Sequence, residues 1–452
     1  MHLKTLLLLF ICSICLIINA FAQNTVDIAS LKDSTIAKLD FKILSMVKQK
    51  DSVAIMVRVT DPGGNFVLGM AKPGHEKQYF TGLTNKAKKE ICEKFTVKEA
   101  SEDKSPVPLY YSIVLDYSGS MDQDYPKMQV AADHFISSFS KSFFTRVNFD
   151  DTIVIVEPRP TRRPKPASND NFADYGRNTA LYAATDAGIK SIKDAPGARF
   201  VVVFTDGKEN ASGGLPIYAA TSYELKLSAL AANVAIYAVG YGVEGYPLLS
   251  EICADTRGEY YDENNIDELV NTFGRLRANA FDHFYFIQAS CSEIPTTLKI
   301  APSGANKTPK EIALVPEPPT PPFPPEPIYL PPLLFNLSKA EVTPKAKETL
   351  EKIADRIVLL LKSDSTMRIE IHGHASPDGG EALNVSLSSD RADAVFNAIK
   401  AIIKKKYAKD VKALLAINRI SAQFFGHERP IYKNTNSPKN YENRRVEIHV
   451  VH

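Results

Sequence analysis

Short runs of alternating apolar and polar positions dominate residues 23–106. The segments 53–59 and 66–68 are examples, and a turn at 61–64 separates them. Short strands joined by such turns are typical of all-β structure, so this part of the chain predicts a small β-sandwich. The region 283–315 is also rich in strand-like segments, and it is a candidate to complete the same sandwich.

Residues 107–282 follow a different pattern, in which apolar strands alternate with helical stretches. Strands are expected at 110–115, 199–204 and 234–239, and helices at 128–139, 180–192 and 223–232. Alternation of this kind produces a parallel sheet with helices on its faces. The segment 199–204 is apolar at consecutive positions, as a central strand covered on both sides requires. The predicted fold is an open, doubly wound (Rossmann-like) α/β sheet.

The clearest boundary lies at residues 316–332, which read PEPPTPPFPPEPIYLPP. Proline removes backbone hydrogen-bond donors and fixes the chain in an extended form. We therefore interpret this stretch as a proline-rich linker, a semi-rigid spacer that reaches on the order of 50 Å and holds two functional units apart. A ligand for an SH3-like domain is the alternative interpretation, and the spacer is favoured.

Residues 333–452 predict a compact α/β sandwich. Thr343 and Pro344 are suited to begin a helix, and apolar side chains recur from there at helical spacing. The remaining elements are a strand, a second helix and a closing strand, at 368–371, 390–404 and 446–450.

The first 22 residues have the composition of a secretory signal peptide. Lys4 precedes an apolar run at 6–18, and Ala20 and Ala22 supply the small residues that a signal peptidase requires. The run is shorter than the roughly 20 residues of a membrane-spanning helix, which argues against an anchor. We expect cleavage after Ala22 and export of the mature chain.

Charge and cysteine content add two constraints. A net charge of +2 and a charged fraction of 23% give no strong bias toward nucleic acid or membrane surfaces. Cys12 and Cys15 leave with the signal peptide, so the three remaining cysteines allow at most one intramolecular disulfide. Cys92 and Cys291 are favoured as partners because both lie beside strand-like segments that flank the central region. Cys253 lies in an apolar helical segment and is expected to be buried.

A candidate cation site begins just beyond the carboxyl end of the strand 110–115, where the sequence reads DYSGS from Asp116 to Ser120. Ligands bind at that edge of doubly wound sheets. The loop can turn one carboxylate and two hydroxyls toward one point, and Thr179 and Asp206 follow other elements to the same edge. Hard cations such as Mg²⁺ accept oxygen ligands of this kind.

These three loops, in this order, resemble the metal-ion-dependent adhesion site (MIDAS) of the von Willebrand factor A-like (VWA) family. The resemblance implies that the metal ligands are Asp116, Ser118, Ser120, Thr179 and Asp206. The implied cation is Mg²⁺ or Mn²⁺. Few formal charges surround it, so it would remain electrophilic, and a carboxylate from a protein ligand could complete its shell.

The C-terminal region resembles the OmpA-like family on three motifs, which are IHGHAS at 371–376, the segment 384–392 and NRRVEI at 443–448. The resemblance begins at about residue 328 and implies noncovalent binding to peptidoglycan. The diaminopimelate stem peptide of peptidoglycan presents carboxylates and an ammonium group. By this resemblance Arg391 binds a carboxylate, for which a guanidinium is suited, and Asn384 and Arg445 are supporting residues.

One position departs from the family pattern, because Ser376 stands where the family has an aspartate. Asp378 is a candidate to supply the missing carboxylate, and the alternative is that the loop 376–380 is only a turn. His372 and His374 also suggest a metal. The sequence shows no third ligand beside them, which favours roles in packing or hydrogen bonding.

These features predict a non-enzymatic scaffold or adhesion protein of the cell envelope, periplasmic and associated with the outer membrane or wall of a Gram-negative-type bacterium. It would bind a protein partner through the cation and peptidoglycan through its C-terminal domain. The alternative is a passive structural wall protein with no metal-dependent ligand. A nucleotide-dependent or hydrolytic enzyme is least favoured, because the sequence contains no GxSxG, HExxH or P-loop motif.

Overall fold

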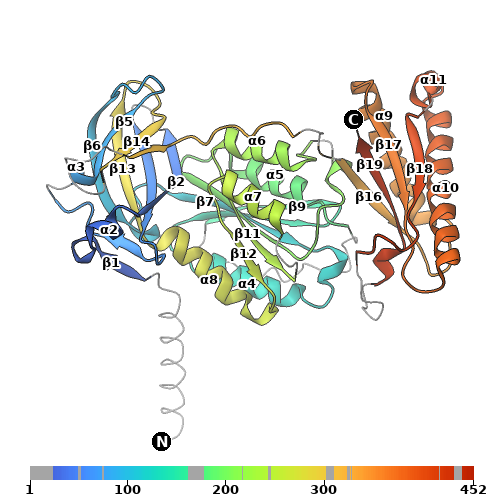
Figure 1. Cartoon of the computed structure of the whole chain (residues 1–452), viewed down its shortest axis with the longest axis horizontal. Helices are drawn as coiled ribbons and strands as arrows, with labels where there is room; N and C mark the ends of the chain where they lie inside the picture. The colour runs from blue at the N-terminus through green and yellow to red at the C-terminus, as the bar shows by residue number, and fades with distance from the viewer. Residues whose placement is uncertain are drawn as a thin grey trace, which may run out of the picture.

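The computed structural model describes residues 24–48, 52–73, 76–160, 178–215, 217–242, 246–301, 310–322, 326, 328–416, 418–431 and 440–451. The predicted signal peptide at 1–22 lies outside these residues. Figure 1 shows three units along the long axis of the molecule: a β-rich unit, a central α/β unit and a C-terminal α/β unit.

The β-rich unit contains two sheets around one core. The larger sheet has the order β1-β4-β3-β13-β6, and β2 also pairs with β3. Its strands are β1 (Thr25–Asp27), β2 (Asp40–Lys48), β3 (Val53–Thr60), β4 (Phe66–Leu68), β6 (Cys92–Ala100) and β13 (Phe284–Cys291). The smaller sheet contains β5 (Phe80–Thr84), β14 (Thr297–Ile300) and β15 (Lys310–Ala313). Ile55, Tyr285 and Leu298 come from both sheets and are fully buried between them.

Two strands that lie on either side of the central unit in sequence are neighbours in the larger sheet. β13 pairs antiparallel with both β3 and β6. Cys291 lies opposite Cys92 in this register, and the two form a disulfide with an S–S distance of 2.06 Å. Cys253 is a buried free cysteine in the helix α7 (Pro247–Asp255). The disulfide therefore joins the two chain segments that enter and leave the central unit.

The central unit is a six-stranded sheet with the order β12-β11-β10-β7-β8-β9. All neighbours are parallel except β8 and β9. Its strands are β7 (Leu109–Asp116), β8 (Phe143–Phe149), β9 (Ile153–Pro160), β10 (Ala198–Thr205), β11 (Ala235–Tyr241) and β12 (Tyr260–Glu263). The strands and helices expected here all form, with ends that differ by a few residues.

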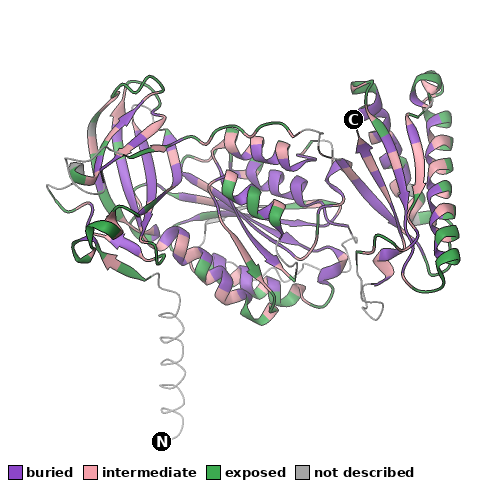
Figure 2. Cartoon of the chain, in the orientation of Figure 1, coloured by how far each residue is buried: buried purple, intermediate pink, exposed green. Residues whose placement is uncertain are grey.

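Helices cover both faces of this sheet (Figure 1). α4 (Tyr125–Ser137) and α8 (Leu269–Arg277) contribute to one core, which also contains Tyr111 and Phe200 from the strands. On the other face, α5 (Leu181–Ile192), α6 (Ser222–Ala232) and α7 surround a second core that contains Val114 and Val201. Figure 2 shows the strands between these layers as almost continuously buried, which is the pattern of a doubly wound sheet.

The C-terminal unit is a four-stranded sheet with the order β16-β19-β17-β18. Its elements are β16 (Ile328–Leu334), α9 (Pro344–Ser363), β17 (Arg368–Gly373), α10 (Glu381–Lys406), β18 (Ile420–Phe424) and β19 (Arg445–Val451). Leu350 and Ile399 from the two long helices share a core with Ile369 and Ile448 from the strands. The predicted second helix starts too late, at residue 390. In the first turns of α10 the buried positions include the polar residues Asn384 and Ser388. The apolar periodicity that predicts a helix is therefore weak in this part of the sequence.

The predicted linker needs correction in two respects. It was expected to extend through Pro332, but β16 begins at Ile328 and pairs with β19 on both sides of a bulge between Leu330 and Leu333. The bulge accommodates the two prolines that the ladder would otherwise exclude. The expectation that the linker holds the two units apart is also wrong, because the linker and β16 contact the central unit.

Among the described residues, contacts from the linker, β16 and α9 join the C-terminal unit to the central unit. Glu326 accepts hydrogen bonds from Ser222 N at 2.8 Å and from Ser222 Oγ at 2.7 Å, at the start of α6. A side chain at Gly213 would come within 2.6 Å of the Tyr329 carbonyl oxygen, so glycine permits this close approach. Arg356 Nε on α9 donates to the Gly213 carbonyl at 3.0 Å. The proline content of the linker predicted an extended backbone, but tertiary contacts decide where the linker lies on the central unit.

Candidate functional sites

Asp116 lies at the end of β7 and links the carboxyl ends of two neighbouring strands. Its Oδ1 accepts a hydrogen bond from Ser118 N at 2.8 Å, which closes the loop after β7. Its Oδ2 accepts one from Thr205 Oγ1 at 2.5 Å, at the end of the adjacent strand β10. The carboxylate is completely buried. Both of its oxygens therefore have fixed positions at the edge of the sheet.

The other oxygens of the predicted cation site lie around this carboxylate. Ser118 Oγ and Ser120 Oγ are 3.1 Å apart, and Ser120 Oγ donates to Asp206 Oδ1 at 2.6 Å. Thr179 approaches from the third loop, because a Cβ built on Gly207 would lie 2.9 Å from Thr179 Oγ1. The structure thus brings all three predicted loops to one place.

Two residues that the sequence argument did not single out hold the loops in position. Thr205 bonds Asp116 as described above. Asn210 Oδ1 accepts from Thr179 N at 2.7 Å, and Asn210 N donates to the Thr179 carbonyl at 3.0 Å. Thr205 could have been anticipated as the polar last residue of β10, after the apolar run 200–204 and next to Asp206. Asn210 carries no comparable sequence signal.

The electrostatics of this cluster suit a divalent cation. Burial, followed by the charge of Asp206, raises the pKa of Asp116 to about 7. Two carboxylates and three hydroxyls supply only oxygen atoms, which are the ligands that Mg²⁺ and Mn²⁺ prefer. A cation between the two carboxylates would relieve their repulsion, so the residues present fit such an ion.

In the C-terminal unit, the guanidinium of Arg391 is buried and bonded to main-chain carbonyls. Nε donates to Lys339 O and Nη1 to His374 O, each at 2.9 Å, and Nη2 donates to Asn336 O at 3.3 Å. Arg391 forms no ion pair with a carboxylate in the described part of the chain. Burial and the nearby charge of Arg444 lower its pKa to about 10.

The remaining predicted wall-binding residues divide into exposed and buried groups. Asp378 is exposed, and its Oδ2 accepts from Asn440 Nδ2 at 2.9 Å. Ser376 and Asn384 are buried, and Asn384 Nδ2 lies 3.2 Å from His427 Nδ1. Arg445 is also buried, and its Nε donates to Glu447 at 2.6 Å.

Arg444 is a residue that the sequence argument quoted within a motif but did not single out. It is partly exposed, and the charge of Asp378 acts on its pKa. Burial outweighs this effect and lowers the pKa of Arg444. Arg444 therefore interacts electrostatically with both Arg391 and Asp378, so two positive charges and one negative charge lie in one region.

Two family models match this chain. Residues 112–275 match the von Willebrand factor type A domain, and residues 334–444 match the OmpA family. The protein therefore contains a VWA domain followed by a C-terminal OmpA-family domain, as the sequence motifs indicated.

Individual relatives match parts of the chain. The probable lipoprotein YiaD of Escherichia coli (strain K12) is 32% identical over 114 residues, which is 25% of this chain and 45% of that protein. This chain thus spans less than half of that relative. The peptidoglycan-associated lipoprotein from Burkholderia pseudomallei is 21% identical and has a TM-score of 0.22, covering 26% of this chain and 88% of that chain. A von Willebrand factor type A protein from Catenulispora acidiphila is 12% identical and has a TM-score of 0.32. The match covers 81% of this chain and 89% of that chain.

Among the helices in the described residues, none combines the length and the apolar composition needed to cross a membrane.

Proposed function

We propose that this protein is an exported cell-envelope scaffold that binds a protein partner through a divalent cation and binds peptidoglycan noncovalently. The VWA domain would bind the partner, and the OmpA-family domain would bind the wall. The presence of both domain families in one chain supports this proposal. Tethering would raise the concentration of the partner near the wall.

The observation that carries the first half of the proposal is the buried oxygen cluster at the ends of β7 and β10. The residues that would hold Mg²⁺ or Mn²⁺ are Asp116, Ser118, Ser120, Thr179 and Asp206. When bound, the cation supplies an electrophilic centre that a partner's carboxylate can complete. Hydrogen bonds from Thr205 to Asp116 and from Thr179 to Asn210 hold two of these proposed ligands in position, which supports the proposal.

The second half rests on the charges around α10. Arg391 is a buried cation without a carboxylate partner in the described residues, and Arg444 lies close enough to affect its pKa. Such a pair favours a ligand carboxylate. The exposed carboxylate of Asp378, held by Asn440, is suited to an ammonium group. A diaminopimelate residue carries both groups, so this region would bind the stem peptide.

An envelope location belongs to the same proposal. The name of the Escherichia coli relative describes it as a probable lipoprotein, and the Burkholderia relative is named as peptidoglycan-associated. The predicted signal peptide with cleavage after Ala22 would deliver this chain to the periplasm, where it would associate with the outer membrane or wall. We propose no enzymatic activity.

Two measurements test the two halves separately. Isothermal titration should detect Mg²⁺ binding that Asp116→Ala abolishes and that the exposed control Asp194→Ala retains. Capture of a partner from envelope extract should depend on Asp116 and fail in EDTA. Partner capture that is unchanged in EDTA and in Asp116→Ala would refute the cation-dependent mechanism and favour the passive structural alternative.

Sedimentation with purified sacculi tests wall binding. The wild-type protein should sediment, and free diaminopimelate should compete. Arg444→Ala and Asp378→Ala should reduce binding, whereas the exposed control Asp393→Ala on α10 should not. Equal sedimentation of all these variants would overturn the proposed wall site.

A further inference from the structure

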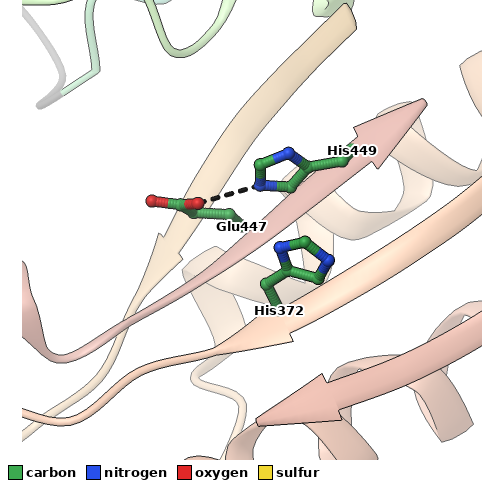
Figure 3. A group of neighbouring side chains, drawn as sticks. All are labelled: His372, Glu447 and His449. Atoms are coloured by element: carbon green, nitrogen blue, oxygen red, sulfur yellow. Dashed lines mark hydrogen bonds and ion pairs between the residues drawn. The ribbon is translucent and has the colours of Figure 1, made fainter. Parts of the chain in front are cut away.

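Two strands of the C-terminal sheet place histidine and glutamate side chains together on the face opposite its helices. His372 on β17 lies directly opposite Glu447 on β19, and Glu370 lies opposite His449. Residues that are directly opposite one another project to the same face. One ligand atom from each of His372, Glu447 and His449 lies within 4.8 Å of the others. Figure 3 shows Glu447 pointing toward His449, with the ring of His372 beside both.

The groups around these residues have the arrangement of supporting contacts in metal sites. His372 Nε2 lies 3.0 Å from Glu370 Oε2, which leaves Nδ1 for a cation. Arg445 Nε holds Glu447 Oε1 at 2.6 Å, while Oε2 lies 2.8 Å from His449 Nε2. Metal-binding histidines commonly use their second nitrogen to bond a carboxylate, which fixes the orientation of the ring.

His374 provides an independent indication of a missing ligand. Its side chain is only 2% exposed, and neither of its ring nitrogens makes a hydrogen bond within the described residues. Its Nε2 lies 3.6 Å from Glu447 Oε2, so the ring is directed toward the same carboxylate as His449. A buried imidazole without a hydrogen-bond partner is unfavourable, and a cation at this place would satisfy it.

Burial and neighbouring groups shift the pKa values of three residues in this cluster. Burial, followed by the charge of His449, lowers the pKa of His372, and burial lowers the pKa of His374. Burial alone would raise the pKa of Glu447, but the imidazoles of His374 and His449 and the charge of Arg445 hold it well below its usual range.

We propose that His372, Glu447 and His449 form a Zn²⁺ site, with His374 in reach as a fourth ligand. Two imidazoles and one carboxylate match the ligands that Zn²⁺ accepts, whereas Mg²⁺ prefers oxygen alone. Tetrahedral Zn²⁺ places its ligand atoms about 3.3 Å apart, so Glu447 Oε2 and His449 Nε2, now 2.8 Å apart, would separate slightly to admit the ion. The ion would connect β17 to the last strand, β19. This site is distinct from the oxygen cluster in the VWA domain.

The test is titration of Zn²⁺ into the untagged full chain in excess Mg²⁺, which occupies oxygen sites. We expect one Zn²⁺ per chain. His372→Ala and His449→Gln should each weaken Zn²⁺ binding at least about tenfold. Glu370→Gln should also weaken it, because the carboxylate of Glu370 bonds Nε2 of His372 and orients that ring. His134→Ala, at an exposed histidine on α4, and Asp116→Ala should bind Zn²⁺ as the wild type does.

A second readout separates loss of the site from loss of the fold. Zn²⁺ should raise the melting temperature of the wild-type protein, because it binds only the folded state. It should not do so in His449→Gln, whose melting temperature in EDTA should equal that of the wild type. The absence of one-to-one Zn²⁺ binding, or equal Zn²⁺ affinity in His372→Ala, His449→Gln and the wild type, would overturn the proposal.

Discussion

Ser120 Oγ donates a hydrogen bond to Asp206 Oδ1 over 2.6 Å, although the two residues are 86 positions apart in the chain. This bond joins the loop after β7, which follows Asp116, to the loop after β10, which carries Asp206. Replacing Ser120 should therefore affect the cluster more than an ordinary serine substitution would.

The first prediction concerns this hydroxyl. Ser120→Ala should lower the Mg²⁺ affinity at least about tenfold, which corresponds to about 1.4 kcal/mol, because it removes both a proposed oxygen ligand and a bond to Asp206. The control is Ser137→Ala on α4, where the hydroxyl bonds only the His134 carbonyl of the same helix. Titration calorimetry measures both variants, and equal Mg²⁺ affinities would contradict the role of Ser120.

The second prediction concerns pH. In the metal-free folded protein the pKa of Asp116 is about 7, whereas its ordinary value is 3.8. Between these values the folded state binds more protons than the unfolded state, so the stability contributed by this group falls as pH rises. In EDTA, the wild type should lose melting temperature relative to Asp116→Asn between about pH 4 and pH 7. Parallel melting curves for the two proteins would count against the shifted pKa.

The third prediction concerns the disulfide. Cys92 and Cys291 close a loop with a sequence separation of 199, which restricts the unfolded chain. Replacing both by serine should destabilise the β-rich unit by about 2–5 kcal/mol. Differential scanning calorimetry should show a lower first transition, and reduction of the wild-type protein should reproduce it. Peptide mapping that found another pairing would refute this connection.

The fourth prediction concerns the linker. Glu326 accepts three hydrogen bonds from the first residues of α6, where a negative charge also favours the helix dipole. Glu326→Ala should detach the linker and raise the rate of limited proteolysis within it at least about tenfold, since bonds to a charged group contribute about 1.5–3 kcal/mol. Glu317→Ala, an exposed glutamate in the same segment, is the matched control. Indistinguishable cleavage rates would show that this contact does not hold the linker.

The fifth prediction separates two roles of Arg391. Arg391→Met should destabilise the C-terminal domain by about 3–5 kcal/mol, because the carbonyls of Lys339, His374 and Asn336 lose their donor. Arg368→Met, at an exposed position of β17, should have little effect. If Arg391→Met instead kept its thermal stability and lost binding to sacculi, the main role of Arg391 would be ligand binding.

The local pattern of the chain determined the elements and much of the oxygen cluster. Apolar runs predicted β7, β10 and β11 because side-chain burial on both faces leaves a continuous apolar signature. The positions of Asp116 and Asp206 followed from the rule that parallel strands meet at one edge. Each of these conclusions depends on residues close in sequence.

Only the tertiary structure decided which distant residues meet. The sequence showed His372 and His374 without a third ligand, and antiparallel pairing of β17 with β19 supplies Glu447 and His449. The proline-rich segment likewise predicted an extended chain, but the contact of Glu326 with α6 fixes its course. Register and docking depend on the summed packing of whole elements, so no local pattern of residues can specify them.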